Sequence, residues 1–328
     1  MKKLGRLAVA LLIMTWSLAC TAAVLSEAPD DTKEGDAGSP CGGSFETAVG
    51  RGQQELEQLP QIDLWFADGV GDQDRQEIRA GLGYAQIYLT AHYTAPLPAF
   101  TCFDIRSSDA GPVGSGRATG NRVLIITAPE GWPIAADWAL PSVVAHEYVH
   151  VWQLLLAGED AFQSSPVWLI EGMSQWMSLQ AMVEAGLLPR EELECRLTAP
   201  RGFLTPHLAV LETPAGWRTS LMNYQLSLDA VNQLVGLADA PALQRYLAAL
   251  GYGQAWQDAF HDAFGRSPAA FYAAFDPADV RILSRQPAPS LFAWRWGSLL
   301  ASRASQSSRL SFHVLTPAFA PTDCEPGH

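Results

Sequence analysis

The stretch of sequence that decides the fold is PSVVAHEYVHVWQLLLAG, which runs from Pro141 to Gly158. Proline suits the first position of a helix, and glycine suits the position just after the last turn. These two residues therefore bracket a predicted helix of about four to five turns. Most residues between them are apolar, so a polar group within this helix needs a bonding partner to offset the loss of contact with water.

Two histidines and a glutamate interrupt this apolar stretch. His146 and His150 are four positions apart, so both imidazoles project from one face of a helix at a spacing that a single zinc ion can bridge. Glu147 lies beside them, placed to act on a water at the metal rather than to bind the metal itself. The spacing therefore predicts a metal site with Glu147 as its general base.

A third ligand is expected from the following helix, which is predicted to begin at Ser165 and Pro166 and to end near Gly186. This helix carries Glu171 within the motif WLIEG. If the two helices lie antiparallel, Glu171 reaches the open side of the histidine pair. Two histidines, one carboxylate and one open position make a zinc site of the catalytic type.

Two acidic residues are alternative third ligands. Glu159 and Asp160 lie between the two predicted helices, and their carboxylates are also of a type that zinc accepts. They belong to a polar turn, however, whereas helix geometry directs Glu171 toward the histidines. We therefore prefer Glu171.

The chain before this helix predicts a small sheet flanked by helices. Strands are expected at residues 62–66, 100–105 and 123–127, where β-branched and apolar residues gather. A helix is expected at about 72–93, begun by Asp72 and with an apolar face. A short helix is expected at 45–59, and the glycine-rich residues 109–121 are interpreted as a loop.

The chain after this helix is predicted to be mostly helical. The recurring punctuation by proline and glycine predicts helices that begin at Pro189, Pro241 and Pro268, and residues 220–235 are apolar with a helical period. The tail 287–328 has no clear period and is interpreted as an extended segment tied back through Cys324. We therefore predict an α+β chain, with a small mixed sheet to about residue 139 and a helical part from residue 140.

The first residues predict an export signal. Lys2, Lys3 and Arg6 precede an apolar stretch that ends among small residues at positions 19–23, and this stretch is short for a membrane span. Cleavage after Ala23 would release a soluble protein, whereas cleavage before Cys20 would leave a lipoprotein anchored to a membrane. Both routes remain open, and residues 24–43 are interpreted as a flexible linker.

Cys20 is lost by one route and lipidated by the other, so four cysteines remain that could pair. An even number without a Cys-x-x-Cys motif is typical of two disulfides in an oxidising compartment, although buried free thiols would give the same count. Three pairings are open for Cys41, Cys102, Cys195 and Cys324.

Composition limits the class of partner. Hydrophobic residues make up 48% of the chain and charged residues 17%, which is typical of a globular protein. The net charge of −13 disfavours nucleic acid and anionic lipid surfaces, because both require concentrated Lys and Arg. Any contact with a membrane is expected only through the lipid anchor at Cys20, and the oligomeric state stays open.

The motifs HEYVH and WLIEG together resemble the gluzincins, zinc peptidases whose third ligand is a glutamate on the following helix. The closer resemblance is to the peptidase MA-like proteins, which share a later helix with the pattern Tyr-x-x-Ser and an Ala-Phe-Gly-x-Ser segment. Here these are YQLS at 224–227 and AFGRS at 263–267. The resemblance covers about residues 62–275 and is specific only around the metal site.

This resemblance implies a zincin-like fold with Zn²⁺ bound by His146, His150 and Glu171, and with Glu147 as the general base. It also implies that strand 123–127 is the edge strand along which an extended peptide substrate lies. The aminopeptidase motif Gly-Ala-Met-Glu-Asn is absent, which argues against that specificity. The metzincin extension is absent too.

Two further site residues are expected. Tyr224 is the candidate donor to the oxyanion that forms on the attacked carbonyl, although a tyrosine in an apolar helix also serves in a core. Gln175, one turn after Glu171, is the candidate partner that orients a ligand histidine, with Ser174 as its rival.

The sequence therefore predicts an exported zinc metallopeptidase that acts on peptides or proteins, by default an endopeptidase. Its peptidase domain is expected at residues 44–285, followed by a C-terminal extension at 286–328. There are two alternatives: a non-catalytic binding protein that keeps the same metal-binding residues, and a zinc hydrolase that acts on another amide or an ester. The substrate and cleavage specificity are not set by these motifs.

Overall fold

The structure is a computed structural model that describes residues 60–107, 115–127, 136–198, 207–217, 221–275 and 314–315. The expected export signal, the linker, the helix at 45–59 and most of the C-terminal extension lie outside these residues, as do Cys20, Cys41 and Cys324. Cys102 and Cys195 are both disulfide-bonded. Among the described residues, no helix combines the length and the apolar character needed to cross a membrane.

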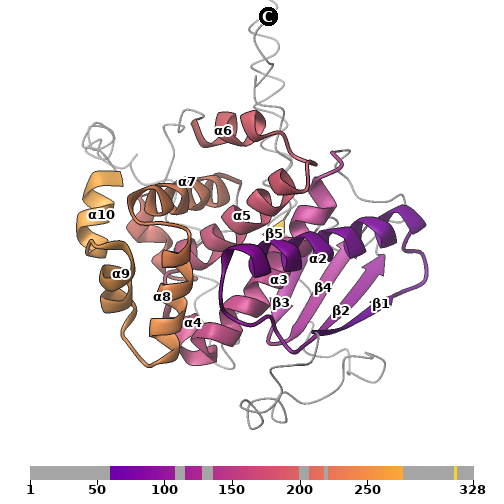
Figure 1. Cartoon of the computed structure of the whole chain (residues 1–328), viewed down its shortest axis with the longest axis horizontal. Helices are drawn as coiled ribbons and strands as arrows, with labels where there is room; N and C mark the ends of the chain where they lie inside the picture. Colours follow the sequence, from indigo (N-terminus) through magenta and orange to yellow (C-terminus); the bar gives the residue numbers. More distant parts are fainter. Residues whose placement is uncertain are drawn as a thin grey trace, which may run out of the picture. The chain divides into compact units, whose positions relative to one another are not determined.

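The N-terminal part is a mixed sheet that is accompanied by one long helix (Figure 1). In chain order its elements are β1 (Gln61–Phe66), α2 (Asp72–His92), β2 (Phe100–Ser107), β3 (Ser115–Thr119) and β4 (Arg122–Thr127). The strand order is β1-β2-β4-β3-β5, where β5 (Val314–Leu315) comes from the far end of the chain. β2 is parallel to both of its neighbours, β1 and β4, whereas β3 is antiparallel to both β4 and β5.

The rest of the described chain is helical. Its elements are α3 (Ala139–Ala157), α4 (Glu159–Ser164), α5 (Val167–Glu184), α6 (Arg190–Thr198), the 3₁₀ helix η4 (Leu208–Glu212), α7 (Leu221–Leu237), α8 (Pro241–Gly251), α9 (Trp256–Phe264) and α10 (Pro268–Phe275). The prediction of an α+β chain, with a small mixed sheet followed by a helical part, is confirmed.

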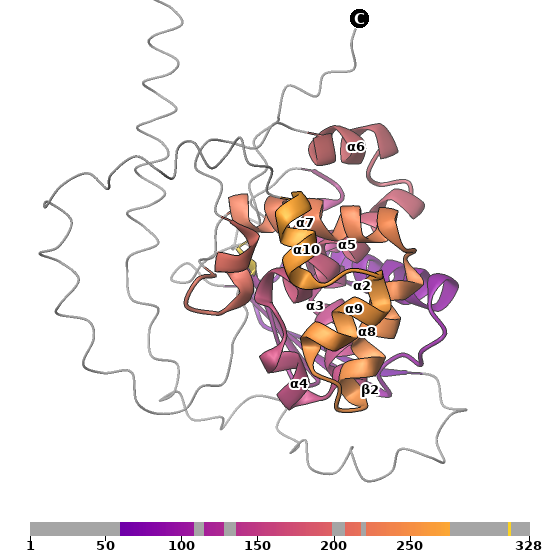
Figure 2. The ribbon, with the colours of Figure 1, turned by 90° about the vertical axis from the view of Figure 1, so that its left-hand side faces the viewer.

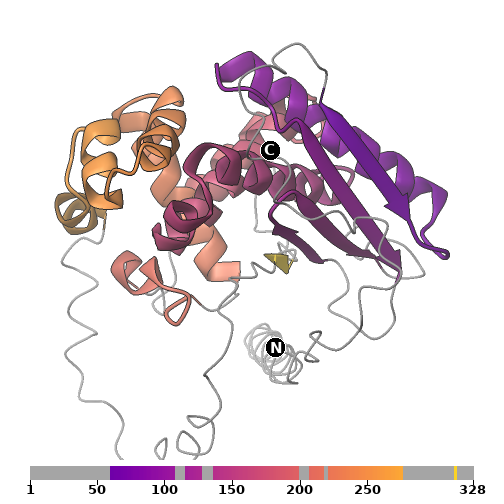
Figure 3. The same ribbon diagram turned by 90° about the horizontal axis from the view of Figure 1, so that it is seen from below.

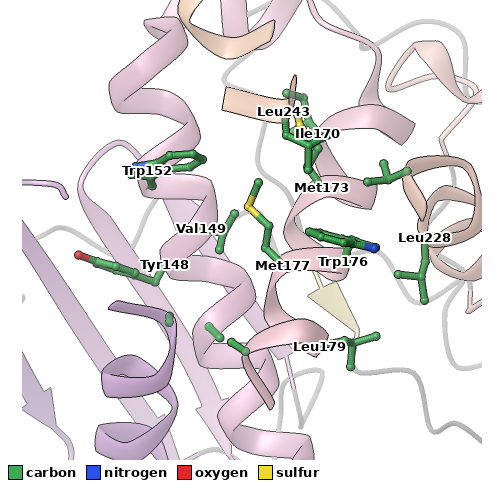
Figure 4. Close-up of a cluster of buried hydrophobic side chains, with 14 of the residues drawn as sticks. Tyr148, Val149, Trp152, Ile170, Met173, Trp176, Met177, Leu179, Leu228 and Leu243 are labelled. Atoms are coloured by element: carbon green, nitrogen blue, oxygen red, sulfur yellow. The ribbon is translucent and has the colours of Figure 1, made fainter. Parts of the chain in front are cut away.

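Helix α3 lies at the centre of the packing. It contacts α2, α5, α8 and strand β3, and almost all of its residues are buried. Figure 4 shows Val149 of α3 facing Met177 of α5, whereas Tyr148 points away from α5 on the other side of α3. The helices α8, α9 and α10 pack together and meet α3 through α8 (Figure 2).

A glycine lets two of these helices approach closely. A Cβ atom on Gly172 of α5 would lie 2.5 Å from the carbonyl oxygen of Ser227 in α7, well inside van der Waals contact. Gly172 directly follows Glu171, so this close approach helps to fix the turn of α5 that carries the carboxylate.

Two expectations about the sheet are wrong. Residues 115–119 form strand β3, not part of a loop, and strand β4 is bonded on both sides and is not the edge strand. The sequence of β3, Ser-Gly-Arg-Ala-Thr, does not predict a strand, because glycine is a poor strand former. The strand forms through its antiparallel pairing with β4 across the turn at Gly120, where φ is 61°.

Candidate metal centre

The three expected ligands meet between α3 and α5. His146 and His150 lie one turn apart on α3, and Glu171 lies in the second turn of α5. Their side chains are buried, with 2% or less of each residue exposed. The Nε2 atoms of the two histidines are 3.0 Å apart, and Glu171 Oε2 lies 3.3 Å from His146 Nε2 and 3.6 Å from His150 Nε2.

This triangle has the size of one face of a tetrahedral metal site. With metal–ligand bonds of about 2.0–2.1 Å, the ligand atoms of a tetrahedron lie about 3.3–3.4 Å apart. The observed separations of 3.0, 3.3 and 3.6 Å bracket that range. Glu171 Oε1 and His146 Nδ1 are also buried without a hydrogen bond of ordinary geometry, while Tyr224 acts on the Glu171 carboxylate and Gln175 on the His146 ring. Two imidazoles and a carboxylate therefore fit a divalent transition metal, and these three residues form the one such group found among the described residues.

Gln153 orients one of the ligands. Its amide nitrogen donates to the backbone oxygen of Ile170 at 3.0 Å, so its amide oxygen faces His150 Nδ1 at 2.9 Å. The Ser174 hydroxyl donates to the same amide oxygen and lies 3.1 Å from His150 Nδ1. An oxygen acceptor at Nδ1 requires that nitrogen to carry the proton. The lone pair of the neutral ring then lies on Nε2, toward the triangle.

Electrostatics also favour a cation at this position. Burial raises the pKa of Glu171, but the neighbouring His150 and His146 outweigh it and lower the pKa to about 2. For His150, burial lowers the pKa, and the carboxylates of Glu171 and Glu147 more than reverse this. For His146, burial dominates and the pKa is lowered. The buried carboxylates of Glu171 and Glu147 therefore favour a positive charge between them and the histidines, and either a proton or a metal ion supplies it.

Glu147 lies next to the two histidine ligands on α3, in the buried interior of the site. It is fully buried, and neither carboxylate oxygen has a hydrogen bond of ordinary geometry. Burial raises its pKa to about 8; the nearby positive charge of His150 and the backbone amide of Ala118 in β3 lower it in part. A carboxylate with this affinity for a proton is suited to general base chemistry near neutral pH.

Strand β3 passes directly over this carboxylate. A Cβ atom on Gly116 would lie 2.7 Å from Cγ and 2.8 Å from Oε1 of Glu147. No side chain fits there, so the glycine is required by the close approach of backbone to side chain. This contact places the sheet and the metal centre in one site.

The structure also places the two remaining predicted site residues near His146. Tyr224 of α7 is buried, and its ring meets that of His146 edge to face at 6.2 Å between centroids. Burial, followed by the charges of Glu171 and Glu147, raises the pKa of its phenol well above the usual value, so the hydroxyl keeps its proton. Gln175 is buried beside His146 and raises the pKa of that ring.

Some residues are not brought into the site, and others were missed. Glu159 and Asp160 are exposed on α4, away from any group that could hold a metal. Gln153 was not considered as a partner of a ligand, although its position three residues after His150 puts both on neighbouring turns of one helix. Gly116 gave no signal, because a lone glycine in a polar stretch reads as part of a loop.

No model of a known protein family matches the chain, and a search of curated proteins finds no match. The description of this site therefore depends on the positions of its own residues.

Proposed function

We propose that this protein is a zinc-dependent metallopeptidase of the gluzincin type, with a zincin-like fold. The observation that carries the proposal is the triangle of His146, His150 and Glu171 with the basic carboxylate of Glu147 beside it. The donor set of two nitrogens and one oxygen suits zinc. A buried carboxylate with a raised pKa beside the ligands is what general base catalysis requires, and metal binding alone does not require it.

Each residue then has a task in peptide hydrolysis. Bound zinc would supply Lewis acidity for the carbonyl and lower the pKa of a water to about 7. Glu147 would accept a proton from the attacking water and return it to the amine that leaves. Tyr224, whose phenol stays protonated, is the donor that we assign to the oxyanion. Gln153 and Ser174 hold His150 in one tautomer and one orientation.

The arrangement of the sheet supports a peptide as the substrate class. β3 passes over Glu147 and is antiparallel to β4, and the backbone groups of its other edge, where β5 pairs with it, lie beside the base. An extended peptide binds to such an edge by adding a strand. We also propose that the protein is exported, either released or anchored through Cys20, because the N-terminal sequence has the pattern of an export signal.

The test compares the wild type with Glu147→Gln on a mixture of denatured proteins. We expect about one zinc per chain in both, and cleavage by the wild type alone, abolished by a chelator. Mass spectrometry of the products would map the cleaved bonds. No cleavage by either form with zinc bound would identify a binding protein. Cleavage only of simple esters or non-peptide amides would identify the other class of hydrolase. Stoichiometric zinc in His146→Ala/His150→Ala would contradict the site itself.

A further inference from the structure

The outer edge of β3 is not open in the structure. β5 pairs with it antiparallel, with Leu315 opposite Ser115 and Val314 opposite Gly116. This strand lies far along the chain from the last described helix, which ends at Phe275. Figure 3 shows it as the short yellow strand beside β3. A segment of the protein itself thus occupies the edge at which a peptide substrate would add a strand.

The register places this segment at the reacting end of the edge. Val314 is the partner of Gly116, and Gly116 is the residue whose Cα lies against the carboxylate of Glu147. Neighbouring strands lie about 4.8 Å apart, so the backbone of β5 follows β3 one strand beyond the general base. A substrate that used the same edge would require the same backbone donors and acceptors.

The pairing that the structure describes covers two residue pairs. β5 comprises Val314 and Leu315, and β3 is its partner among the described strands. Each backbone hydrogen bond adds only a small net gain in water. The segment is nevertheless part of the same chain, which gives it a high effective concentration at the edge without the need for tight binding.

We propose that the segment around Val314 and Leu315 occupies the peptide-binding edge of β3 in place of substrate and holds the enzyme in a self-blocked state. This rests on the proposed peptidase function. The block is released when the segment is cut away by another peptidase or displaced by a substrate that binds the edge more tightly. β5 is then a regulatory strand rather than one needed for the fold.

The experiment uses the full chain with Val314→Pro/Leu315→Pro, which removes both backbone donors of β5. The matched control, Val314→Ile/Leu315→Val, keeps the donors and the strand propensity. Two measurements are made on all three proteins: hydrogen exchange of the amides of β3, and kcat/KM on a peptide that the wild type cleaves.

We expect the proline variant to exchange the amides of Ser115–Thr119 faster and to gain about tenfold or more in kcat/KM, mainly through a lower KM. Such a gain corresponds to an edge that is free about a tenth of the time in the wild type. The control should match the wild type. An added peptide with the sequence of residues 310–317 should restore protection of β3 in the proline variant and inhibit it competitively.

The outcomes separate this proposal from the proposed function. If β3 exchanges equally fast in all three proteins, β5 does not occupy the edge and the proposal is overturned. If only the proline variant loses protection but its kcat/KM equals that of an active wild type, the segment pairs without blocking. That also overturns the proposal and leaves the peptidase intact. If all three bind zinc but none cleaves a peptide, the peptidase assignment fails, and the proposed block fails with it.

Discussion

Gly116→Ala tests whether strand β3 and the general base form one site. The added Cβ would lie 2.7 Å from Cγ of Glu147 and 2.8 Å from its Oε1. Non-bonded carbon atoms prefer about 3.5–4.0 Å, so strand and carboxylate must separate by about 1 Å. Either β3 lifts away from α3 or the side chain of Glu147 turns.

Both responses harm the site, and each has its own measurable signature. If the strain stays in the packing between β3 and α3, overpacking of this size costs about 1–3 kcal/mol of stability, which is measured as a lower Tm. If the side chain of Glu147 turns instead, a misplacement of the base by about 1 Å lowers kcat by about 10²-fold. We expect the second effect to dominate, because a side chain moves more readily than a strand paired on both sides. Zinc content should not change, because no ligand is touched.

The matched control is Gly83→Ala in α2, where a Cβ would meet nothing within 4 Å. Alanine is favoured over glycine in a helix by about 0.5–1 kcal/mol, so this variant should be slightly more stable than the wild type and equally active. The measurements are kcat on a mapped peptide, zinc by mass spectrometry and Tm by calorimetry. A Gly116→Ala protein with the kcat and Tm of the wild type would refute the contact between β3 and the base.

In metal-free protein, Glu147→Gln should weaken the dependence of stability on pH. Burial raises the pKa of this carboxyl from 4.5 to about 8, so the folded state binds the proton more tightly and the wild type loses stability as the pH rises between these values. Urea unfolding in chelator at pH 5 and pH 8 measures the difference, and an equal loss in both proteins would count against the buried position of Glu147. Gln153→Leu should weaken zinc binding about 10–100-fold, because His150 loses the acceptor that fixes its tautomer. Competition with a chromophoric chelator measures this, and an unchanged affinity would show that Ser174 suffices. Gly172→Ala should lower the free energy of unfolding by about 1–3 kcal/mol, because its Cβ would lie 2.5 Å from the oxygen of Ser227. Thermal denaturation tests this, and an unaltered Tm would mean that α5 and α7 do not pack so closely.

The metal-binding half of the site could be predicted because its geometry is local. A spacing of four residues fixes His146 and His150 on one face of any helix. Proline and glycine then marked where α3 ends and α5 begins, and Gly158 does take a positive φ of 75° at the end of α3. Only one non-local step was needed, the antiparallel packing that brings Glu171 to the pair.

The partners of the ligands were harder to predict, because a hydrogen bond depends on which way a side chain turns. Gln153 and Gln175 lie on different helices, and both are buried near the ligands. Sequence spacing favoured Gln175. The structure adds Gln153, whose amide is held by the backbone oxygen of Ile170 on the opposite helix. No pattern within one helix encodes that contact.

The part of the site that we propose binds substrate depends on pairings between strands, and these leave little trace in composition. β4 has the β-branched sequence expected of a strand, but nothing in that sequence tells whether one or both of its edges are bonded. Gly116 decides whether β3 can pack over the metal centre, since only a strand without a side chain at this point can lie over Glu147. The edge of β3 that faces away from β4 pairs with β5, which lies about 200 residues further along the chain. Two motifs near the middle of the sequence therefore supply the residues of the proposed chemistry, whereas the proposed access to it depends on residues at 115–119 and 314–315 that no local rule connects.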